Sequence, residues 1–429
     1  MRNMEYSLKV ISWNITRVCN LRCSHCYLPA AFRLEDSPVE SPSDELTTEK
    51  ALQVIDQIAE VNSEVMLVLS GGEPLMRRDV FKLAEHAHKR GIMVVLGTNG
   101  LLINDKVIGK MKQAGVSGVS ISLDSVSPEI HDSSRQANGA WKRAVAAIEM
   151  CRANDLSVQI SAVVTRNNYD EVPDLIEFAR SLRANVFSPF FMVCTGRGEE
   201  FTDITAVQYE ELLSMLVHMQ RKRGDMMIRT RCAPTFRRIL YQIYPGSNLL
   251  KLDAGKCMAG TNYCRITPEG SVTPCPYMET QAGKLTNEGF HQVWHHSSVF
   301  AFLRKATPKG KCGECEFIQL CGGCRARALS AHGDILAEDP WCAYYPAGGD
   351  IINPPVFQVT SSVTDRGSTC SPVWSSEAEE RMKRIPFFVR SMIRSAIERY
   401  AADNKYREIT PEVLAKARED YGMGKMTRP

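Results

Sequence analysis

Residues 13–27 read Trp13-Asn-Ile-Thr-Arg-Val-Cys-Asn-Leu-Arg-Cys-Ser-His-Cys-Tyr27, in which three cysteines follow an apolar, strand-like start. Cys19, Cys23 and Cys26 have the spacing C-x3-C-x2-C, so one tight loop carries three thiolates. Soft sulfur ligands favour iron–sulfur chemistry, and three thiolates can hold three irons of a [4Fe–4S] cluster. The fourth iron has no protein ligand in this loop, which indicates a reactive site. A zinc site, which usually has four closed ligands, and buried core cysteines are the alternatives.

The composition of the chain is that of an ordinary globular protein of two or three domains. It has 429 residues, 44% hydrophobic and 24% charged, with a net charge of +3, so we expect no nucleic-acid partner. It has no run of 18 apolar residues and no signal-peptide core near Met1, so we expect no membrane span and a cytoplasmic location. Fifteen cysteines in such a chain indicate metal or cluster ligation, not disulfides.

Strand-like and helix-like segments alternate through residues 7–199. The expected strands are residues 10–15, 65–69, 93–96, 116–123, 158–164 and 186–192, and the expected helices are residues 48–61, 79–90, 104–114, 141–154 and 170–182. This alternation predicts an α/β fold with a parallel sheet and outer helices, either doubly wound or a partial barrel. Ligands of such folds lie at the carboxyl ends of the strands, where the cysteine loop follows the first strand.

The rest of the chain divides into three regions by composition. Residues 200–345 begin with a helical stretch and become cysteine-rich and irregular. Residues 346–373 contain glycine, proline, serine and threonine with little periodicity, which predicts a linker. Residues 374–424 form a small helical unit, in which Thr410 is a candidate N-cap and Pro411 the first helical residue.

Ser70-Gly-Gly-Glu-Pro74 follows the second expected strand. Together with the cysteine loop, this stretch resembles the signature of the radical S-adenosylmethionine (SAM) enzymes. The resemblance implies that the backbone at Gly71, Gly72 and Pro74, with Glu73, receives the methionyl ammonium of SAM. It also implies that SAM chelates the open iron and is cleaved by an electron to a 5′-deoxyadenosyl radical. This chemistry starts without a general acid or base, so we expect no catalytic side chain of that kind.

Four further residues are candidates for the SAM site. Asn99 follows the third strand and is expected to line the same cleft, with an ordinary Asn-Gly turn as the alternative. Ser122 and Asp124 point to one side of the fourth strand, which suits a ribose hydroxyl or the substrate. Arg135 is expected from the resemblance to pair with the SAM carboxylate, and a surface arginine is its alternative.

Eight later cysteines form two groups of four. Gly270-Ser-Val-Thr-Pro-Cys275 and the later C-x2-C-x5-C run resemble the SPASM extension, which holds auxiliary [4Fe–4S] clusters. The resemblance implies one cluster on Cys257, Cys264, Cys275 and Cys324, and another on Cys312, Cys315, Cys321 and Cys342. The family commonly has three residues before the last cysteine of the run, but here there are two, so one or two auxiliary clusters are expected. Two zinc sites are the alternative.

Several stretches resemble the alternative haem-biosynthesis branch of these enzymes: residues 195–198, 231–238, 256–260, 321–328 and 332–338. The resemblance implies a partial (βα)6 TIM-type barrel with a SPASM domain and a small C-terminal helical domain. It also implies an iron porphyrin substrate, namely iron-coproporphyrin III, two propionates of which are oxidatively decarboxylated to vinyls to give haem b. A didecarboxysirohaem deacetylase, a haem d1 side-chain enzyme and a SPASM peptide maturase are the alternatives.

Four further expectations concern partners and substrate contacts. An electron donor such as flavodoxin or ferredoxin is expected, and Cys232 or a nearby histidine is a candidate contact to haem iron. Residues 374–390 resemble the small C-terminal domain of the light-independent protochlorophyllide reductase subunit, with a generic docking unit as the alternative. A non-catalytic electron carrier would leave the Gly71–Pro74 stretch without a role. Candidates for propionate binding are Arg197, Arg229, Arg231, Arg237 and Arg238.

Overall fold

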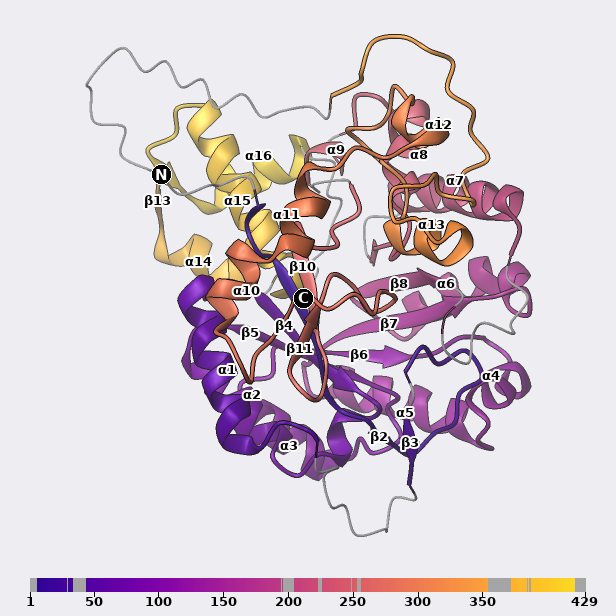
Figure 1. Ribbon diagram of the computed structural model, residues 1–429. Coiled ribbons are helices and arrows are strands. Elements are labelled where there is room, and N and C mark those ends of the chain that lie inside the picture. The colour runs from indigo at the N-terminus through magenta and orange to yellow at the C-terminus, as the bar shows by residue number, and fades with distance from the viewer. Residues whose placement is uncertain are drawn as a thin grey trace.

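A ten-stranded sheet organises the molecule (Figure 1), in the order β12-β11-β10-β1-β4-β5-β6-β7-β8-β9. The computed structural model describes residues 6–28, 30–33, 44–193, 195, 204–222, 226–247, 249–252, 256–353, 372–383, 385 and 387–420. Six consecutive strands pair in parallel: β1 (Val10–Thr16), β4 (Met66–Gly71), β5 (Met93–Thr98), β6 (Gly118–Ser122), β7 (Ser157–Val164) and β8 (Val186–Phe191). The α/β class with a parallel sheet is therefore confirmed.

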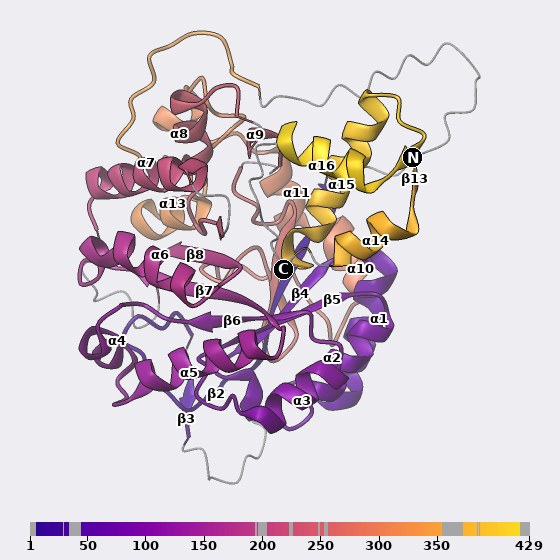
Figure 2. The same cartoon turned by 180° about the vertical axis from the view of Figure 1, so that it is seen from behind.

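Helices cover the outer face of these strands, as Figure 2 shows from behind. They are α1 (Thr48–Val61), α2 (Val80–Lys89), α3 (Asp105–Gln113), α4 (Pro128–Arg135), α5 (Ala140–Ala153) and α6 (Val172–Ser181). Short elements between them are β2 (Val18–Cys19), β3 (Ala31–Phe32) and the 3-10 helices η2 (Pro74–Met76) and η3 (Tyr169–Glu171). A strand order with separate ends, and with helices on one side, is compatible with a partial barrel.

The strands have one apolar and one polar face. In β7, Val158 and Ile160 are buried in the core under the helices, whereas Gln159 and Ser161 alternate with them and line a cavity on the inner face. This period of two explains why runs that read as apolar still carry polar residues. The inner, polar face is where the site lies.

Residues 200–345 continue the same sheet at both edges. β9 (Met227–Ile228) pairs with β8, and β10 (Tyr263–Ile266) pairs with β1, each in parallel. β11 (Ser271–Thr273) and β12 (Gly283–Lys284) extend β10 antiparallel. The sheet thus crosses the predicted boundary near residue 200. The helices of this region are α7 (Ala206–Lys222), α8 (Thr235–Ile243), α9 (Leu249–Leu252), α10 (Phe290–His296), α11 (Ser298–Lys305), α12 (Gly310–Gly313) and α13 (Arg325–His332).

A small helical unit at the C-terminal end packs over the amino ends of the parallel strands (Figures 1 and 2). It contains α14 (Ser376–Lys383), α15 (Phe387–Asp403) and α16 (Pro411–Asp420), with β13 (Val373–Trp374) paired to β14 (Glu408–Ile409). Met66, Val68 and Val95 pack against this unit and also line the inner cavity. The helical unit therefore closes the base of the cavity.

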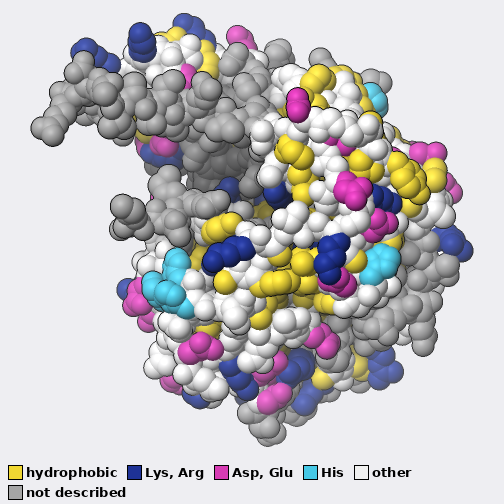
Figure 3. All heavy atoms as spheres, turned by 45° about the horizontal axis from the view of Figure 1, so that its top comes forward, with side chains coloured by type: hydrophobic (Ala, Val, Ile, Leu, Met, Phe, Trp, Pro, Cys, Tyr) yellow, Lys and Arg dark blue, Asp and Glu magenta, His cyan; other side chains and the backbone are white. Residues whose placement is uncertain are grey.

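Charge and hydropathy of the surface agree with the near-neutral composition. Figure 3 shows one face on which Lys and Arg side chains alternate with Asp and Glu side chains, between hydrophobic ones. No helix among the described residues combines the length and the apolar character that a membrane span needs. Of the predicted linker, residues 346–353 contain neither helix nor strand, and residues 354–371 lie outside the described residues.

Candidate functional site

A cavity of about 450 Å³ opens on the inner face of the sheet. Its volume is within the range of small-molecule and cofactor sites, roughly 300–1,000 Å³. Side chains from the carboxyl halves of the strands line it, including Ser70, Ser122 and Ser161. The cysteine loop and several later cysteines line the same cavity. One chamber therefore joins motifs that are far apart in the sequence.

The glycines of the Gly71–Pro74 stretch bring the cysteine loop close to the sheet. A Cβ atom at Gly71 would collide with the carbonyl oxygen of Thr16, and one at Gly72 with that of Val18. The amide of Gly72 donates to Thr16 O (2.8 Å), and the amide of Glu73 donates to Val18 O (2.8 Å). The sequence suggested close approach to a ligand as the reason for glycine. The structure shows close approach to the backbone that leads into Cys19.

Glu73 holds two loops together. Its buried carboxylate accepts hydrogen bonds from Thr98 Oγ1 (2.8 Å), the amide of Asn99 (2.9 Å) and the amide of Leu75 (3.1 Å). Burial raises the pKa of Glu73 to about 7. Asn99 in turn donates from Nδ2 to Asn20 Oδ1 (2.7 Å), inside the cysteine loop. These contacts fix the loops after β4 and β5 against the loop that carries the thiols.

Asp124 and Arg135 form a buried ion pair beside the thiols. Arg135 Nη2 lies 2.7 Å from Asp124 Oδ2, and Arg135 Nη1 lies 3.8 Å from Cys23 Sγ. Although burial opposes ionisation, Arg135, with His25 and His131 nearby, holds the pKa of Asp124 well below its usual range. Ser122 and Arg135 line the cavity. Asp124 is engaged in fixing Arg135, while its predicted contact with a ribose hydroxyl or substrate stays a prediction.

The cysteine loop fits a cluster with one open iron. Cys19, Cys23 and Cys26 all line the cavity, and Arg135 supplies a cation beside the negatively charged sulfurs. The Nε atom of Arg135 is buried and has no hydrogen-bond partner within the described part of the chain. A buried donor of this kind fits an acceptor bound in the cavity. Three thiols beside an open side fit a [4Fe–4S] cluster with an exchangeable site, and the nearby cation would tune its reduction potential.

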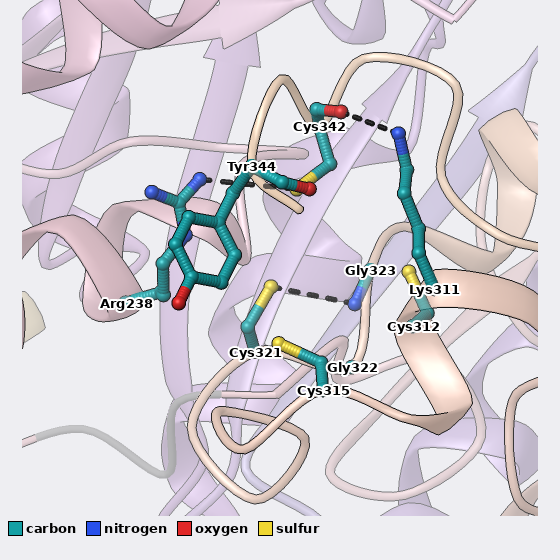
Figure 4. Close-up of a pocket in the computed structure, with 9 residues that line it drawn as sticks. All are labelled: Arg238, Lys311, Cys312, Cys315, Cys321, Gly322, Gly323, Cys342 and Tyr344. Carbon is teal, nitrogen blue, oxygen red and sulfur yellow. Dashed lines mark hydrogen bonds between the residues drawn. The ribbon is translucent and has the colours of Figure 1, made fainter. Parts of the chain in front are cut away.

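A second opening is surrounded by four other thiols, which we name the outer thiols (Figure 4): Cys312, Cys315, Cys321 and Cys342. The amide of Gly323 donates to Cys321 Sγ (3.4 Å), and the amide of Asp339 donates to Cys312 Sγ (3.4 Å). Arg238 Nη2 lies 3.8 Å from Cys342 Sγ. Hydrogen bonds to sulfur tune the reduction potential of a cluster, so this closed set fits electron transfer.

Two consecutive glycines separate the outer thiols from the main cavity. Gly322 and Gly323 have φ of 68° and 70°, a left-handed conformation that favours glycine. A Cβ at Gly323 would lie 3.0 Å from Cys312 Sγ. The turn sends Cys321 to the outer opening and Cys324 to the main cavity. The short spacing noted in the sequence is therefore compatible with two separate thiol groups.

The other predicted group is only partly brought together. Cys257, Cys275 and Cys324 line the main cavity, whereas Cys264 is fully buried in the apolar core outside it. The cavity is instead lined by Cys232, which belongs to the haem-branch-like stretch 231–238 and not to the SPASM-like cysteine pattern. Within the described ranges, no three His, Cys, Asp or Glu side chains are close enough to hold a single metal ion. The thiols instead surround the two cavities, and this arrangement fits the ligands of an iron–sulfur cluster, which is larger than a single metal ion.

Several predicted propionate-binding arginines face the main cavity. Arg229, Arg231 and Arg237 line it, together with Lys256. Arg238 lies instead at the outer thiols, where it pairs with Glu210. Arg197 lies outside the described residues. Three of the five candidates are therefore concentrated around one chamber.

Three family models match the chain. The radical SAM superfamily model matches residues 13–179, and the iron-sulfur cluster-binding domain model (SPASM) matches residues 257–316. The model of the proto-chlorophyllide reductase 57 kD subunit matches residues 374–418, in the small helical unit. These matches confirm the resemblances found in the sequence, and they imply a SAM-binding [4Fe–4S] cluster and auxiliary clusters.

Relatives agree with this assignment. The AdoMet-dependent heme synthase of Methanosarcina barkeri (strain Fusaro / DSM 804) is 37% identical over 80% of this chain and 98% of its own length. The mycofactocin maturase MftC of Mycolicibacterium smegmatis is 32% identical over 77% and 82%. Streptococcus suis SuiB bound to S-adenosylmethionine shares the fold, with a TM-score of 0.62 at 17% identity over 79% and 78%. The chain therefore belongs to the radical SAM superfamily, among the SPASM-containing enzymes that include the AdoMet-dependent heme synthases.

Proposed function

We propose that this radical SAM enzyme oxidatively decarboxylates two propionates of iron-coproporphyrin III to vinyl groups, giving haem b. One observation carries the proposal: Arg229, Arg231, Arg237 and Lys256 line the same cavity as the cysteine loop. Propionates are carboxylates, and the planar guanidinium fork is suited to bind them. The similarity to the heme synthase of M. barkeri, over almost all of that protein, supports the same substrate class.

Separate groups of residues would bind the cluster and SAM. Cys19, Cys23 and Cys26 would hold the SAM-binding cluster, and Arg135 would bind the SAM carboxylate. The backbone from Gly71 to Pro74 would receive the methionyl ammonium. With SAM, the cluster supplies a carbon radical that removes a hydrogen atom from the substrate.

The polar inner face suits the nucleoside. Ser120 Oγ lies 2.7 Å from Ser161 Oγ, and Gln159 Nε2 donates to both hydroxyls, at 3.1 and 3.0 Å. Hydroxyl and amide groups inside the cavity can orient sugar hydroxyls while apolar neighbours exclude water. We expect Ser122, on the same face, to take part.

The decarboxylation requires an electron acceptor. Loss of a hydrogen atom and of carbon dioxide from each propionate leaves one electron on the side chain, which becomes the vinyl group once that electron is removed. The cysteines that line the cavity beyond the SAM site would hold a cluster that accepts this electron first, and the outer thiols would hold a second cluster. A flavodoxin- or ferredoxin-type donor would reduce the SAM-binding cluster.

An anaerobic turnover assay tests this function. The protein is reconstituted with iron and sulfide and mixed with SAM, dithionite and iron-coproporphyrin III. We expect 5′-deoxyadenosine and haem b to form together. Deoxyadenosine without any change of the porphyrin would keep the enzyme class and contradict the substrate.

Arginine variants sharpen this assay. Arg231→Gln should raise the KM for the porphyrin by about ten- to a hundredfold, since a lost charge-assisted hydrogen bond costs about 1.5–3 kcal/mol. Arg238→Gln is the matched control, because Arg238 lies at the outer thiols. It should leave that KM unchanged. Equal KM values for both variants would place the propionates elsewhere.

A peptide maturase is the second candidate, because a mycofactocin maturase aligns with the chain over similar coverage. A didecarboxysirohaem deacetylase or a haem d1 side-chain enzyme would also use a cationic chamber. The two tetrapyrrole alternatives are tested by offering didecarboxysirohaem or the haem d1 precursor in the same assay, and the peptide alternative by offering a precursor peptide. The three arginines in the cavity favour a substrate with several carboxylates over a peptide of unspecified charge.

A further inference from the structure

Cys232 has an unusual backbone conformation for its residue type. It has φ of 56°, in the left-handed region that side chains with a Cβ atom rarely adopt. The preceding residue, Arg231, pairs with Phe190 beyond the end of β9, and α8 begins shortly afterwards. Such conformations persist where surrounding contacts impose them, and they are concentrated at functional sites.

The conformation directs the Cys232 thiol toward three other thiols. Cys257, Cys275 and Cys324 line the main cavity with it, and all four belong to one small packed group with Ala259 and Met278. We name these four residues the inner thiols.

Strand geometry directs Cys264 away from the inner thiols. In β10, Tyr263 faces the main cavity, so the next side chain points to the opposite side of the sheet. There Cys264 lies opposite Ile11 of β1 and is buried with it in the apolar core. A ligand role would require reversing the register of a strand that is paired on both sides.

A buried ion pair fixes the positions of two inner thiols. Arg327 Nη1 donates to the carbonyl oxygen of Cys232 (2.7 Å), and the amide of Cys324 donates to Asp339 Oδ2 (2.7 Å). Arg327 and Asp339 are joined by two contacts of 2.9 Å. The pair therefore links the backbones of the two cysteines, as the outer contacts of a metal site do.

We propose that Cys232 is the fourth ligand of the inner auxiliary cluster, with Cys257, Cys275 and Cys324, and that Cys264 is a core residue. The proposal rests on the iron–sulfur chemistry of the family and not on the porphyrin substrate. It gives the inner cluster four thiolates, which suits electron transfer and leaves no open iron. It also removes Cys232 as a contact to haem iron.

The test compares two matched cysteine variants. A parent protein with Cys19, Cys23 and Cys26 changed to alanine retains only the auxiliary clusters, and Cys232→Ala or Cys264→Ala is added to it. Iron content, Mössbauer and EPR spectra are recorded after anaerobic reconstitution. Cys232→Ala should lose one auxiliary cluster or convert it to a three-iron form, whereas Cys264→Ala should retain the parent spectra. Parent spectra in Cys232→Ala, or loss of a cluster only in Cys264→Ala, would overturn the proposal.

Thiol alkylation gives a second readout that needs no variant. The reconstituted protein without porphyrin is treated anaerobically with iodoacetamide before and after the clusters are removed with a chelator and oxidant. Mass spectrometry should find Cys232 protected before removal and labelled after it, since its residue is only partly buried. Labelling of Cys232 while both auxiliary clusters are intact would contradict ligation and would return Cys232 to a contact with haem iron.

Discussion

The cysteine loop and the auxiliary thiols differ in how the chain supplies them. The loop takes its three thiols from residues 19–26, whereas the inner thiols come from residues 232–324 and the outer thiols from residues 312–342. Each region also contains a buried ion pair: Asp124–Arg135 beside the loop and Asp339–Arg327 beside the auxiliary thiols. In the proposed arrangement, the loop thiols would leave one iron open to SAM, and the inner and outer thiols would each supply four ligands to a cluster. The compact motif would then carry the reactive cluster, and the dispersed thiols the electron-transfer clusters.

The largest expected effect is the loss of SAM cleavage on changing the cysteine loop, with the auxiliary clusters retained. Cys23→Ala removes one of the three loop thiols, so SAM cleavage should fall below detection, measured as 5′-deoxyadenosine after addition of dithionite. The auxiliary clusters should persist in Mössbauer spectra, because none of their thiols is changed. Continued cleavage of SAM would show that the open iron is not in this loop.

Gly323→Ala should damage the auxiliary region alone. The added Cβ would lie 3.0 Å from Cys312 Sγ and 2.9 Å from Asp339 Cβ, at a left-handed φ that alanine disfavours. We expect loss of outer-cluster iron and several-fold less haem b, while SAM cleavage without substrate continues. Gly109→Ala, where an added Cβ meets nothing within 4 Å, is the control. Full iron content in Gly323→Ala would show that the glycine turn is not needed to divide the thiols.

The two ion pairs allow a matched comparison. Asp124→Asn and Asp339→Asn each leave a buried arginine without its carboxylate, which costs about 3–5 kcal/mol of stability. Asp124→Asn should weaken SAM binding and spare the auxiliary EPR signals, while Asp339→Asn should alter those signals and spare SAM binding. Equal effects of both variants on SAM binding would mean that the two regions are not independent.

Stability should rise with pH because of Asp124 and Asp339 and fall with pH because of Glu73. The pKa values of Asp124 and Asp339 are lowered in the folded state, so their contributions are present above about pH 4 and lost as the pH falls below it. The pKa of Glu73 is raised to about 7, so the folded state loses stability as the pH rises from about 4 to 7.

The smallest predicted effect is that of Glu73→Gln, which tests whether the wild-type protein loses stability as the pH rises from about 4 to 7. The variant's free energy of unfolding, measured with urea, should improve relative to wild type by up to about 3 kcal/mol between pH 4 and 7. The charge of the wild-type carboxylate develops in that range, and the amide never acquires one. A constant difference between the two proteins at all pH values would contradict the raised pKa.

Local features of this protein could be predicted from the sequence. The parallel strands and most outer helices follow from short apolar runs and helical periodicity, and the loop thiols from their spacing. α4 was missed because it has only eight, mostly polar residues, although Ser127 and Pro128 are a recognisable helix start. The role of Asp124 as the partner of Arg135 was missed because the pair forms only after β6 and α4 have packed together.

The full set of inner thiols could not be predicted from the sequence. The C-x2-C-x5-C run indicated the outer thiols, since most of them lie close together in the chain. The choice between Cys232 and Cys264 depends on which face of β10 turns inward, and that follows from its pairing with β1. The stretch around Cys232 indicated contact with the substrate, but nothing in it indicated that the thiol lies beside Cys257, Cys275 and Cys324.

The most direct test of the proposed chemistry is the transfer of hydrogen from substrate to SAM. Iron-coproporphyrin III deuterated on its propionate side chains is turned over anaerobically, and the products are analysed by mass spectrometry. We predict deuterium in 5′-deoxyadenosine together with formation of haem b. Unlabelled 5′-deoxyadenosine and an unchanged porphyrin would contradict the account.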